Sequence, residues 1–363
     1  MNVPLVDLKA QYESIKEEID RAISLCLEQQ RWIGGEIITE FEKNFAKYCG
    51  AKYVIGTSSG TSALSLAMKS YCVDFKQVIL PSNTFIATAE AITEANAHPK
   101  FVDVDNSSYN IDAKKLRKAV TDDTIAIVPV HLFGQPADMT PILNLAKEKD
   151  LIVIEDAAQA HNAEYKGSKL PIAETGCYSF YPGKNLGAYG DAGAVVTRNK
   201  VVADEVRMML NHGREEGEKY ISKVLGSNNR IDTLQAAILN VKLKYLDDWT
   251  KQRIKNAKIY NDLFKDTEII TPFKAPNRKH VYHLYVVRVK ERDKLQKFLA
   301  KKGIGTGIHY PIPVHRQKPF DDGSSFPVTE RLSGEILSLP MYAELQEEQI
   351  TYVVDMVKKF YQR

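Results

Sequence analysis

One lysine of the sequence lies in a setting that suits chemistry better than it suits a protein surface. Lys184 falls in the segment Pro182–Gly187, whose proline and glycines indicate a turn between two apolar stretches. A turn directs the amine into a site, whereas a solvated helix face would direct it to water. The rival interpretation is a Walker phosphate loop, which needs a glycine where Tyr178 stands and a serine or threonine where Asn185 stands. Lys184 is therefore the first candidate for a catalytic group.

A carboxylate follows the apolar run 151–154, in the segment Glu155-Asp156-Ala157-Ala158-Gln159-Ala160-His161. An unpaired charge at the end of a buried strand is expensive, so Asp156 needs a partner. A pyridinium N–H is one candidate partner, and a structural salt bridge or a helix cap is the alternative. Gln159 and His161 follow closely enough to line the same crevice.

Two further segments suit a flat, phosphorylated ligand. The small-residue loop Gly56–Leu64 opens a helix, so free backbone N–H groups and the helix dipole would cradle a phosphate near Gly60. The alternative is an ordinary serine or threonine helix cap. Phe85 follows the second predicted strand and would stack on a heterocycle, although a place in the core is commoner for phenylalanine.

The order of these groups along the chain is more informative than any one of them. A phosphate cradle, a stacking ring, an aspartate at a strand end and a lysine on a turn are the set that holds pyridoxal phosphate. Ligands of open α/β sheets lie beyond the carboxyl ends of the strands, so the polar residues that follow each predicted strand are candidates for the binding site. Together the four groups favour a pyridoxal-phosphate site.

The elements that must position these groups form an α/β pattern. Short apolar runs separated by helical stretches predict a mostly parallel sheet covered on both faces, with strands at 53–55, 77–80, 100–104, 124–130 and 151–156. Helical spacing predicts packing helices at 7–30 and 37–48 and one long helix at 233–264. Beyond it we expect a small α+β domain, with a strand at 282–289, a helix at 292–302, a return strand at 303–310 and a terminal helix at 344–361.

The composition of the 363 residues excludes several classes of protein. With 44% hydrophobic and 26% charged residues and a formal net charge of +3, it is that of a globular protein that binds neither nucleic acid nor an anionic membrane. No apolar run approaches the roughly 20 residues of a membrane span, and no signal peptide is present, so we expect a cytoplasmic protein. The four cysteines lack CxxC spacing, which predicts reduced, mostly buried thiols and no metal site.

Two motifs make the chain similar to a known family. Ser179-Phe180-Tyr181-Pro182-Gly183-Lys184-Asn185-Leu186-Gly187-Ala188 and Glu155-Asp156-Ala157-Ala158-Gln159-Ala160 resemble those of the DegT/DnrJ/EryC1/StrS sugar aminotransferases, over essentially the whole length. The resemblance implies the aspartate-aminotransferase-like fold type I. It also implies a large cofactor-binding domain at 1–250, with a mostly parallel, mixed seven-stranded sheet between helices, and a small C-terminal α+β domain at 251–363.

The same resemblance implies how the cofactor, pyridoxal 5'-phosphate or its pyridoxamine form, would be held. Lys184 would form the Schiff base, Asp156 would pair with the pyridine nitrogen, and Gln159 would lie at the phenolic oxygen. The backbone of Gly60 and Thr61 and the hydroxyl of Ser179 would bind the phosphate, and Phe85 would stack on the ring. Asn229, in Ser227-Asn228-Asn229-Arg230, would reach the phosphate of a partner subunit, which implies a homodimer with shared active sites.

The resemblance also suggests the substrates. The loop 180–188 is most similar to enzymes that aminate C3 of a dTDP-3-keto-6-deoxyhexose, with L-glutamate as the usual amino donor, to make a dTDP-3-amino-3,6-dideoxyhexose. The alternatives are C4 amination of a nucleotide-linked 4-keto sugar, a sugar dehydratase whose relatives replace the lysine by histidine, and a non-catalytic regulator that holds the cofactor. The candidate substrate-binding residues are His309, Tyr310, His315, Arg31 and Tyr181, with the turn Asn211-His212-Gly213-Arg214 as a further candidate.

Overall fold

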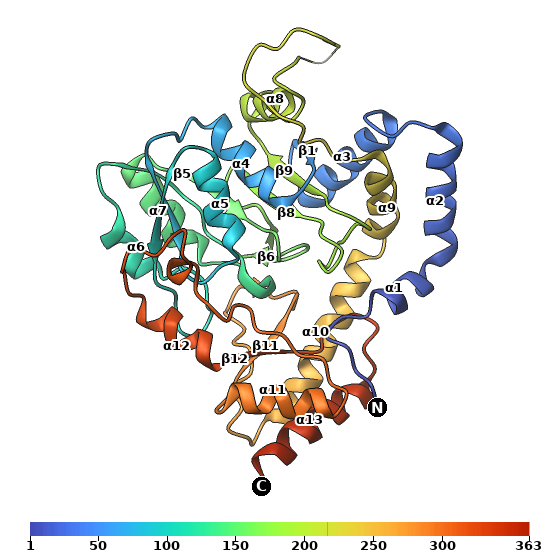
Figure 1. The fold of residues 1–363 in the computed structure, drawn as a ribbon, viewed down its shortest axis with the longest axis vertical. Coiled ribbons are helices and arrows are strands. Elements are labelled where there is room, and N and C mark those ends of the chain that lie inside the picture. The colour runs from blue at the N-terminus through green and yellow to red at the C-terminus, as the bar shows by residue number, and fades with distance from the viewer. Residues whose placement is uncertain (216, 363) are drawn as a thin grey trace.

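The computed structural model describes residues 1–215 and 217–362, and its larger part is built around one sheet (Figure 1). Within these residues seven strands pair in the order β1-β9-β8-β5-β4-β2-β3. Only β9 runs antiparallel to its neighbours, so the sheet is mixed and mostly parallel, as predicted. The strands are β1 (Tyr53–Thr57), β2 (Gln77–Pro81), β3 (His98–Val102), β4 (Thr124–Ile127), β5 (Ile152–Asp156), β8 (Thr175–Ser179) and β9 (Gly193–Thr197).

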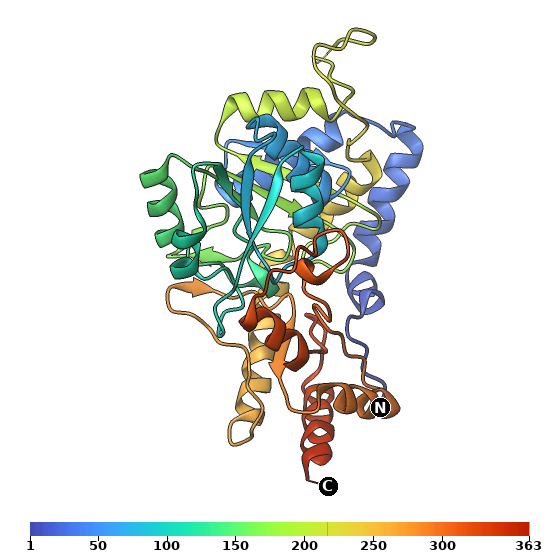
Figure 2. The ribbon, with the colours of Figure 1, turned by 60° about the vertical axis from the view of Figure 1, so that its left-hand side comes forward.

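Alternation along the strands sends side chains into two separate cores. Val54 and Val153 point into one core, and their neighbours Ile55 and Ile154 point into the other, because successive side chains of a strand face opposite sides. One core packs against α3 (Glu36–Cys49), α6 (Ala113–Ala119) and α7 (Met139–Lys149). The other packs against α4 (Gly60–Ser70), α5 (Ile86–Glu94) and α8 (Lys200–Met209). The sheet is therefore the middle of three layers (Figure 2).

Two predicted helices are each broken into a pair. The segment 7–30 forms α1 (Leu8–Ser14) and α2 (Lys16–Gln29), and the segment 233–264 forms α9 (Thr233–Leu243) and α10 (Leu246–Phe264). At both breaks a backbone N–H bonds to the carbonyl three residues earlier, Ile15 to Tyr12 at 3.1 Å and Tyr245 to Lys242 at 3.0 Å. Such bonds tighten the last turn of a helix and change the direction of the chain.

The C-terminal part has its own core below the sheet (Figure 1). There β11 (Tyr285–Arg288) pairs antiparallel with β12 (Ile336–Leu339), beside α11 (Arg292–Lys301), α12 (Pro327–Glu335) and α13 (Glu347–Tyr361). The predicted return strand at 303–310 is wrong, since buried β12 takes that place next to β11. Gly303, Gly305 and Gly307 explain the difference, because glycine weakens a strand.

Smaller elements complete the chain. The strands β6 (Glu164–Tyr165), β7 (Ser168–Lys169) and β10 (Arg278–Lys279) form a three-stranded sheet, and η1 (Leu132–Gly134) and η2 (Val314–Arg316) are short 3₁₀ helices. Helix α10 begins before residue 250 and continues well past it, and the domain boundary at that residue stays a prediction.

Two predictions about the chain as a whole concern membrane-spanning segments and the cysteines. Across residues 1–215 and 217–362, no helix has both the length and the apolar character needed to cross a membrane. The four cysteines are free, but the thiols are not equally covered. Cys26, Cys49 and Cys177 are buried, whereas Cys72 is exposed.

The aromatic cluster between α3 and the sheet yields a stability prediction. The ring of Phe45 lies 5.2 Å from that of Tyr178 and 5.3 Å from that of Phe180, and its side chain is buried. We expect Phe45→Ala to lower the free energy of unfolding by about 3–5 kcal/mol, because it removes buried apolar surface and leaves a cavity. The midpoints of thermal and chemical unfolding measure the loss. Phe75→Ala is the control, since Phe75 is 74% exposed. Equal midpoints for both variants would contradict the prediction.

Candidate functional site

Asp156 ends strand β5 as a buried carboxylate with two hydrogen-bond donors. The Thr88 hydroxyl donates to Oδ2 at 2.8 Å, and the Ala158 N–H donates to Oδ1 at 3.1 Å. Burial raises the pKa of this carboxyl above its ordinary value, while the two donors and the charge of Lys184 act in the opposite direction. A cationic N–H placed against Asp156 would favour its ionised form further.

Lys184 sits on a turn that is closed by backbone hydrogen bonds. Its own N–H donates to the Tyr181 carbonyl at 2.8 Å, and the Ala188 N–H donates to the Phe180 carbonyl at 2.7 Å. Burial lowers the pKa of the Lys184 amine to about 8, and the Asp156 charge limits that fall. The amine therefore loses its proton closer to neutral pH than an ordinary lysine does, as a nucleophile requires.

The first turn of α4 meets the end of strand β8. The hydroxyl of Ser59 accepts from the Ser62 N–H at 3.1 Å, so the helix has the serine cap that was the alternative to a cradle. This cap leaves the N–H groups of Gly60 and Thr61 without helical partners, as at every helix N-terminus. A Cβ atom on Gly60 would lie only 2.7 Å from Cβ of Ser179, so the two predicted phosphate-binding segments are neighbours. A serine cap therefore leaves donors free for an anion, and phosphate binding at this helix end stays a prediction.

An aromatic ring lies at the opening of the site. Phe85 is 53% exposed, which rules out the core position that was its alternative. Its ring centroid lies 5.6 Å from that of Tyr310, and the Tyr310 hydroxyl accepts from Nε2 of Gln159 at 3.0 Å. Oε1 of Gln159 accepts from the Phe133 N–H at 2.7 Å, which fixes the orientation of the amide. Three predicted residues from distant segments thus form one connected group.

Three imidazoles are close enough to Lys184 for its charge to lower their pKa, and two of them, His161 and His283, are buried. Burial, followed by the Lys184 charge, lowers the pKa of His161 to about 3 and that of His309 to about 4, and the pKa of His283 falls well below its ordinary value for the same reasons. These shifts favour the neutral form of all three rings. Nδ1 of His309 lies 2.8 Å from the Ser338 hydroxyl, whereas neither ring nitrogen of buried His161 has a hydrogen-bond partner in the described parts of the chain.

Other predicted residues lie apart from this group. His315 is buried, and its Nε2 lies 3.0 Å from a carboxylate oxygen of Glu330, while its Nδ1 has no hydrogen-bond partner among the described residues. Tyr181 is 59% exposed beside the lysine turn. In the turn 211–214, Oδ1 of Asn211 accepts from Nη2 of Arg214 at 2.8 Å. A contact of these residues with substrate stays a prediction.

Asn229 lies beside the start of α4 of its own chain. Its backbone carbonyl accepts from the Ser58 N–H at 2.8 Å, and its Oδ1 accepts from the Ser62 hydroxyl at 3.2 Å. The side chain thus lies beside the predicted phosphate-binding turn of its own chain. Its contact with the phosphate of a partner subunit stays a prediction.

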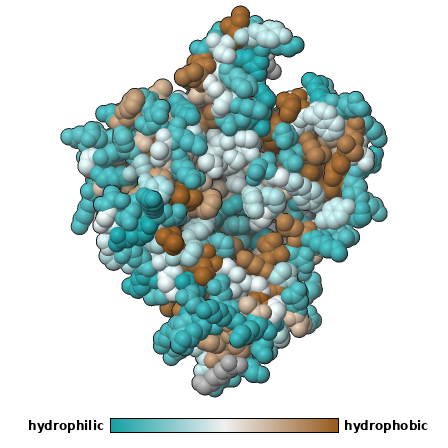
Figure 3. Space-filling model, viewed as in Figure 1, coloured by the Kyte–Doolittle hydropathy of each residue, from teal (hydrophilic) through white to brown (hydrophobic). Residues whose placement is uncertain are grey.

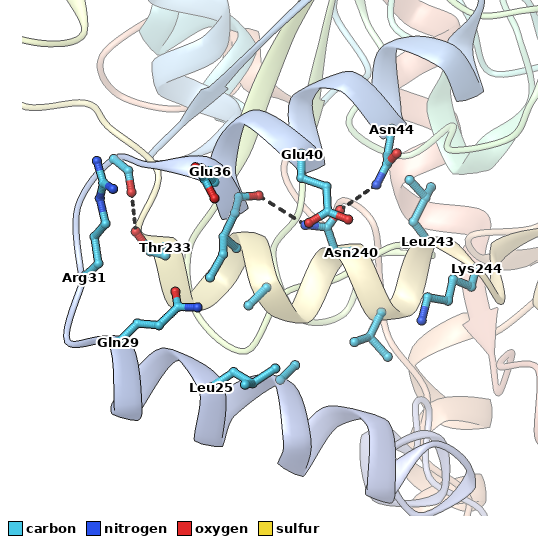
Figure 4. Close-up of a pocket in the computed structure, with 15 residues that line it drawn as sticks. Leu25, Gln29, Arg31, Glu36, Glu40, Asn44, Thr233, Asn240, Leu243 and Lys244 are labelled. Carbon is cyan, nitrogen blue, oxygen red and sulfur yellow. Dashed lines mark hydrogen bonds between the residues drawn. The ribbon is translucent and has the colours of Figure 1, made fainter.

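Arg31 lines a groove between α2, α3 and α9 (Figure 4). The groove holds about 620 Å³, and neither Lys184 nor Asp156 lines it. A second hollow of about 490 Å³ adjoins the Phe85–Tyr310 pair. Arg316 and Lys318 line this hollow and give it positive charge, part of which Glu330 offsets, since its carboxylate lies 3.0 Å from Nη2 of Arg316.

The sequence left several contributors to the site unnoticed. Thr88 holds Asp156, Nδ1 of His283 lies 3.3 Å from Oδ1 of Asn185, and Nε2 of His131 lies 2.8 Å from a Glu155 oxygen. For Thr88 a signal existed, since it is a hydroxyl residue in the mostly apolar segment Ile86–Ile92, whose other polar residue is Glu90. For His131 and His283 no local pattern was available, because their partners lie in distant segments.

Comparisons with known proteins agree with this geometry. A family model described as the DegT/DnrJ/EryC1/StrS aminotransferase family matches residues 13–358. A protein of Geobacillus stearothermophilus named "Pleiotropic regulatory protein" is 43% identical over 99% of both chains. The "dTDP-3-amino-3,6-dideoxy-alpha-D-galactopyranose transaminase" of Aneurinibacillus thermoaerophilus is 42% identical over 99% of both chains. The crystal structure of S. venezuelae DesV in complex with a ketimine intermediate has a TM-score of 0.97 at 38% identity, covering 100% of this chain and 99% of that one.

The lowered pKa of Lys184 leads to a prediction about the cofactor-free protein. We expect acetylation of Lys184 to rise with pH through a midpoint near 8. In Asp156→Asn the midpoint should move lower, because the lost negative charge favoured the ammonium form. Mass spectrometry of the Lys184 peptide measures both, with exposed lysines of the same digest as the reference for reagent reactivity. A wild-type midpoint near that of an ordinary lysine, or an upward shift in Asp156→Asn, would contradict the prediction.

Proposed function

The chain belongs to the DegT/DnrJ/EryC1/StrS aminotransferase family, and from this premise we propose that it aminates the C3 keto carbon of a dTDP-3-keto-6-deoxyhexose. The observation that carries the proposal is a turn-borne lysine of lowered pKa within the electrostatic influence of a buried, hydrogen-bonded aspartate. The product would be a dTDP-3-amino-3,6-dideoxyhexose for deoxyamino-sugar biosynthesis.

The residues present fit pyridoxal phosphate, the cofactor of this family. The N-terminus of α4 and Ser179 suit the phosphate, and Asp156 suits the ring nitrogen. The exposed ring of Phe85 suits one face of a heterocycle, and Gln159 lies close enough to meet its phenolic oxygen. When bound, the cofactor supplies an electron sink for a carbanion.

The protein's own groups have distinct tasks in this proposal. Asp156 would hold a proton on the pyridine nitrogen, because its two hydrogen-bond donors and the cationic ring N–H would together oppose the rise in its pKa that burial causes. Nζ of Lys184 would bind the cofactor and, as a free amine, would move a proton to or from the substrate carbon. The lowered pKa values of His161 and His309 favour neutral rings, which add no positive charge near the amine.

The substrate is proposed from relatives and from charge. The Aneurinibacillus relative is named a transaminase of a dTDP-linked 3-amino sugar. The hollow lined by Arg316 and Lys318 next to Phe85 and Tyr310 supports an acceptor that carries a diphosphate, and His309 precedes Tyr310 in the chain. Glutamate as donor follows from the family resemblance. C4 amination remains the alternative within the same chemistry.

We also propose that two copies of the chain share their active sites. A narrow arm projects beyond the body of the molecule between α8 and α9 (Figures 1 and 2), with Tyr220 84% and Leu225 96% exposed. Apolar residues also gather on the face formed by α2 and α9, at the right of Figure 3. Exposed apolar surface of this kind typifies protein interfaces. The arm returns to the body through Asn229.

Two alternatives weigh less. The dehydratase would have a histidine in place of Lys184. A non-catalytic regulator has one observation in its favour, the name of the Geobacillus relative. A regulatory role, however, gives no reason for a lysine whose pKa is lowered. The cytoplasm stays the proposed location of the protein.

An absorbance spectrum tests the proposed reaction. The purified protein with pyridoxal phosphate should show the visible band of a lysine-bound cofactor, and L-glutamate should convert it to the band of the pyridoxamine form. Lys184→Ala should lack the visible band, because it has no amine at that position. A colourless protein that stays colourless with added cofactor would overturn the proposal. A bound cofactor that no amino donor converts would favour the dehydratase or the regulator.

The keto sugar can be identified in the same cuvette. The pyridoxamine form should return to the starting spectrum with a dTDP-3-keto-6-deoxyhexose and not with the 4-keto isomer. Nuclear magnetic resonance of the product then locates the new amine. Recovery with the 4-keto sugar alone would replace C3 amination by C4 amination and leave the transferase intact.

Mixed dimers test the sharing of sites. We expect Lys184→Ala and Asn229→Ala homodimers to be impaired, since one lacks the amine and the other a phosphate ligand. In a mixed dimer one site would combine the intact Lys184 of one chain with the intact Asn229 of the other, so activity should return to about half of the wild-type value per dimer. Without recovery in verified mixed dimers, Asn229 would serve its own chain, next to Ser62.

A further inference from the structure

A buried lysine that takes no part in the proposed reaction lies behind the catalytic turn. Lys242, near the end of α9, is 0% exposed, although lysine is almost never fully buried. Its Nζ donates to the Gly187 carbonyl at 2.8 Å and lies 4.2 Å from the centre of the Tyr189 ring. Both partners belong to the segment that follows Lys184.

A second side chain of α9 holds the same segment. Oε1 of Gln235, two helical turns before Lys242, accepts from the Tyr189 N–H at 2.9 Å. Residues seven apart lie on one face of a helix. A Cβ atom on Gly190 would lie 2.9 Å from Nε2 of Gln235, so helix and segment are in close contact. One face of α9 thus supports the chain from Gly187 to Gly190.

The turn itself depends on this support on one side. A Cβ atom on Gly187 would lie 2.3 Å from the Pro182 carbonyl oxygen, so the two limbs of the turn press against each other. One backbone bond, from Ala188 to Phe180, closes its base. The Gly187 carbonyl turns away from that base to meet Lys242. On the far side the ring of Tyr189 meets Tyr12 edge-on at 6.3 Å.

Stability alone does not explain a lysine at this position. Burial costs an ammonium group several kcal/mol, and replacing a buried charge by an apolar side chain is often neutral or stabilising. Burial also lowers the pKa of Lys242 to about 7, while the charge of Glu344 acts in the other direction. A methionine would fill the same space without this cost. What it would lack is a donor for the Gly187 carbonyl and a cation over the Tyr189 ring.

We propose that Lys242 is a positioning residue, which fixes Gly187 and Tyr189 so that the turn presents the Lys184 amine at one place in the site. This inference rests on the proposed function for its kinetic consequence and on the geometry alone for its effect on the turn. Lys242 touches neither substrate nor cofactor. It acts through the backbone three residues after Lys184.

The test compares Lys242→Met with Lys244→Met, a matched control near the same helix end whose Nζ pairs with Glu18 at 2.9 Å on the surface. In the cofactor-free proteins, hydrogen exchange of the peptide 180–190 should be about ten times faster in Lys242→Met, while the melting temperature is unchanged or higher. In the loaded proteins, the rate of conversion by saturating donor should fall about 10- to 100-fold, with the donor concentration for half-maximal rate within about threefold. Lys244→Met should match wild type in every respect.

A second pair covers the case in which Lys242→Met does not fold. Tyr189→Phe keeps the ring beneath the ammonium and removes only a buried hydroxyl that has no hydrogen-bond partner within the described residues, so it should behave as wild type. Tyr189→Leu removes the ring and should repeat the effects expected of Lys242→Met. Wild-type exchange and kinetics in Lys242→Met, or equal behaviour of the two Tyr189 variants, would overturn the proposal. A wild-type protein that shows no conversion would instead refute the proposed function, and the exchange data would still decide the role of Lys242.

Discussion

The burial of a carboxylate at the end of β5 is the constraint on which the rest of the site depends. Asp156 is shielded from water. Without hydrogen-bond donors and positive charge around it, burial would favour the protonated form of its carboxyl group. Helix α5 contributes the Thr88 hydroxyl, the following turn contributes the Ala158 N–H, and the lysine turn contributes a cation. The same burial, extended to Lys184, lowers the pKa of the amine toward neutrality. One region shielded from water therefore contains both the hydrogen-bonded carboxyl group of Asp156 and the amine of Lys184 with its lowered pKa.

The mixed sheet explains why segments far apart in the chain meet at that carboxylate. Strands β1, β5 and β8 run in one direction, so the loops after them emerge at one edge of the sheet. The anion site follows β1, Asp156 ends β5, and Ser179 ends β8. The C-terminal part then closes this edge from below, because Tyr310 reaches Gln159 and the ring of Phe85. A fold with fewer parallel neighbours would place these loops on opposite sides.

The sequence was sufficient to predict those features of the fold that depend on residues close together in the chain. Short apolar runs separated by helical stretches identified the sheet, and the proline and glycines around Lys184 identified its turn, because both depend on nearest neighbours in the chain. The strand at 303–310 failed because β-pairing depends on a competitor thirty residues away, which no local propensity reveals. Thr88, His283 and Lys242 were missed for a related reason, since their partners become neighbours only after folding. The roles of individual site residues came from family resemblance, and they remain predictions.

The placement of Val3 connects the first residues of the chain with its last third. Val3 is completely buried among C-terminal residues, with its N–H bonded to the Gly303 carbonyl and its own carbonyl bonded to the Gly305 N–H, both at 2.8 Å. During synthesis the amino terminus leaves the ribosome first, yet the residues that cover it are among the last to emerge. Val3 therefore cannot dock until residues 303–305 have been synthesised, so its burial follows the synthesis of the whole sheet.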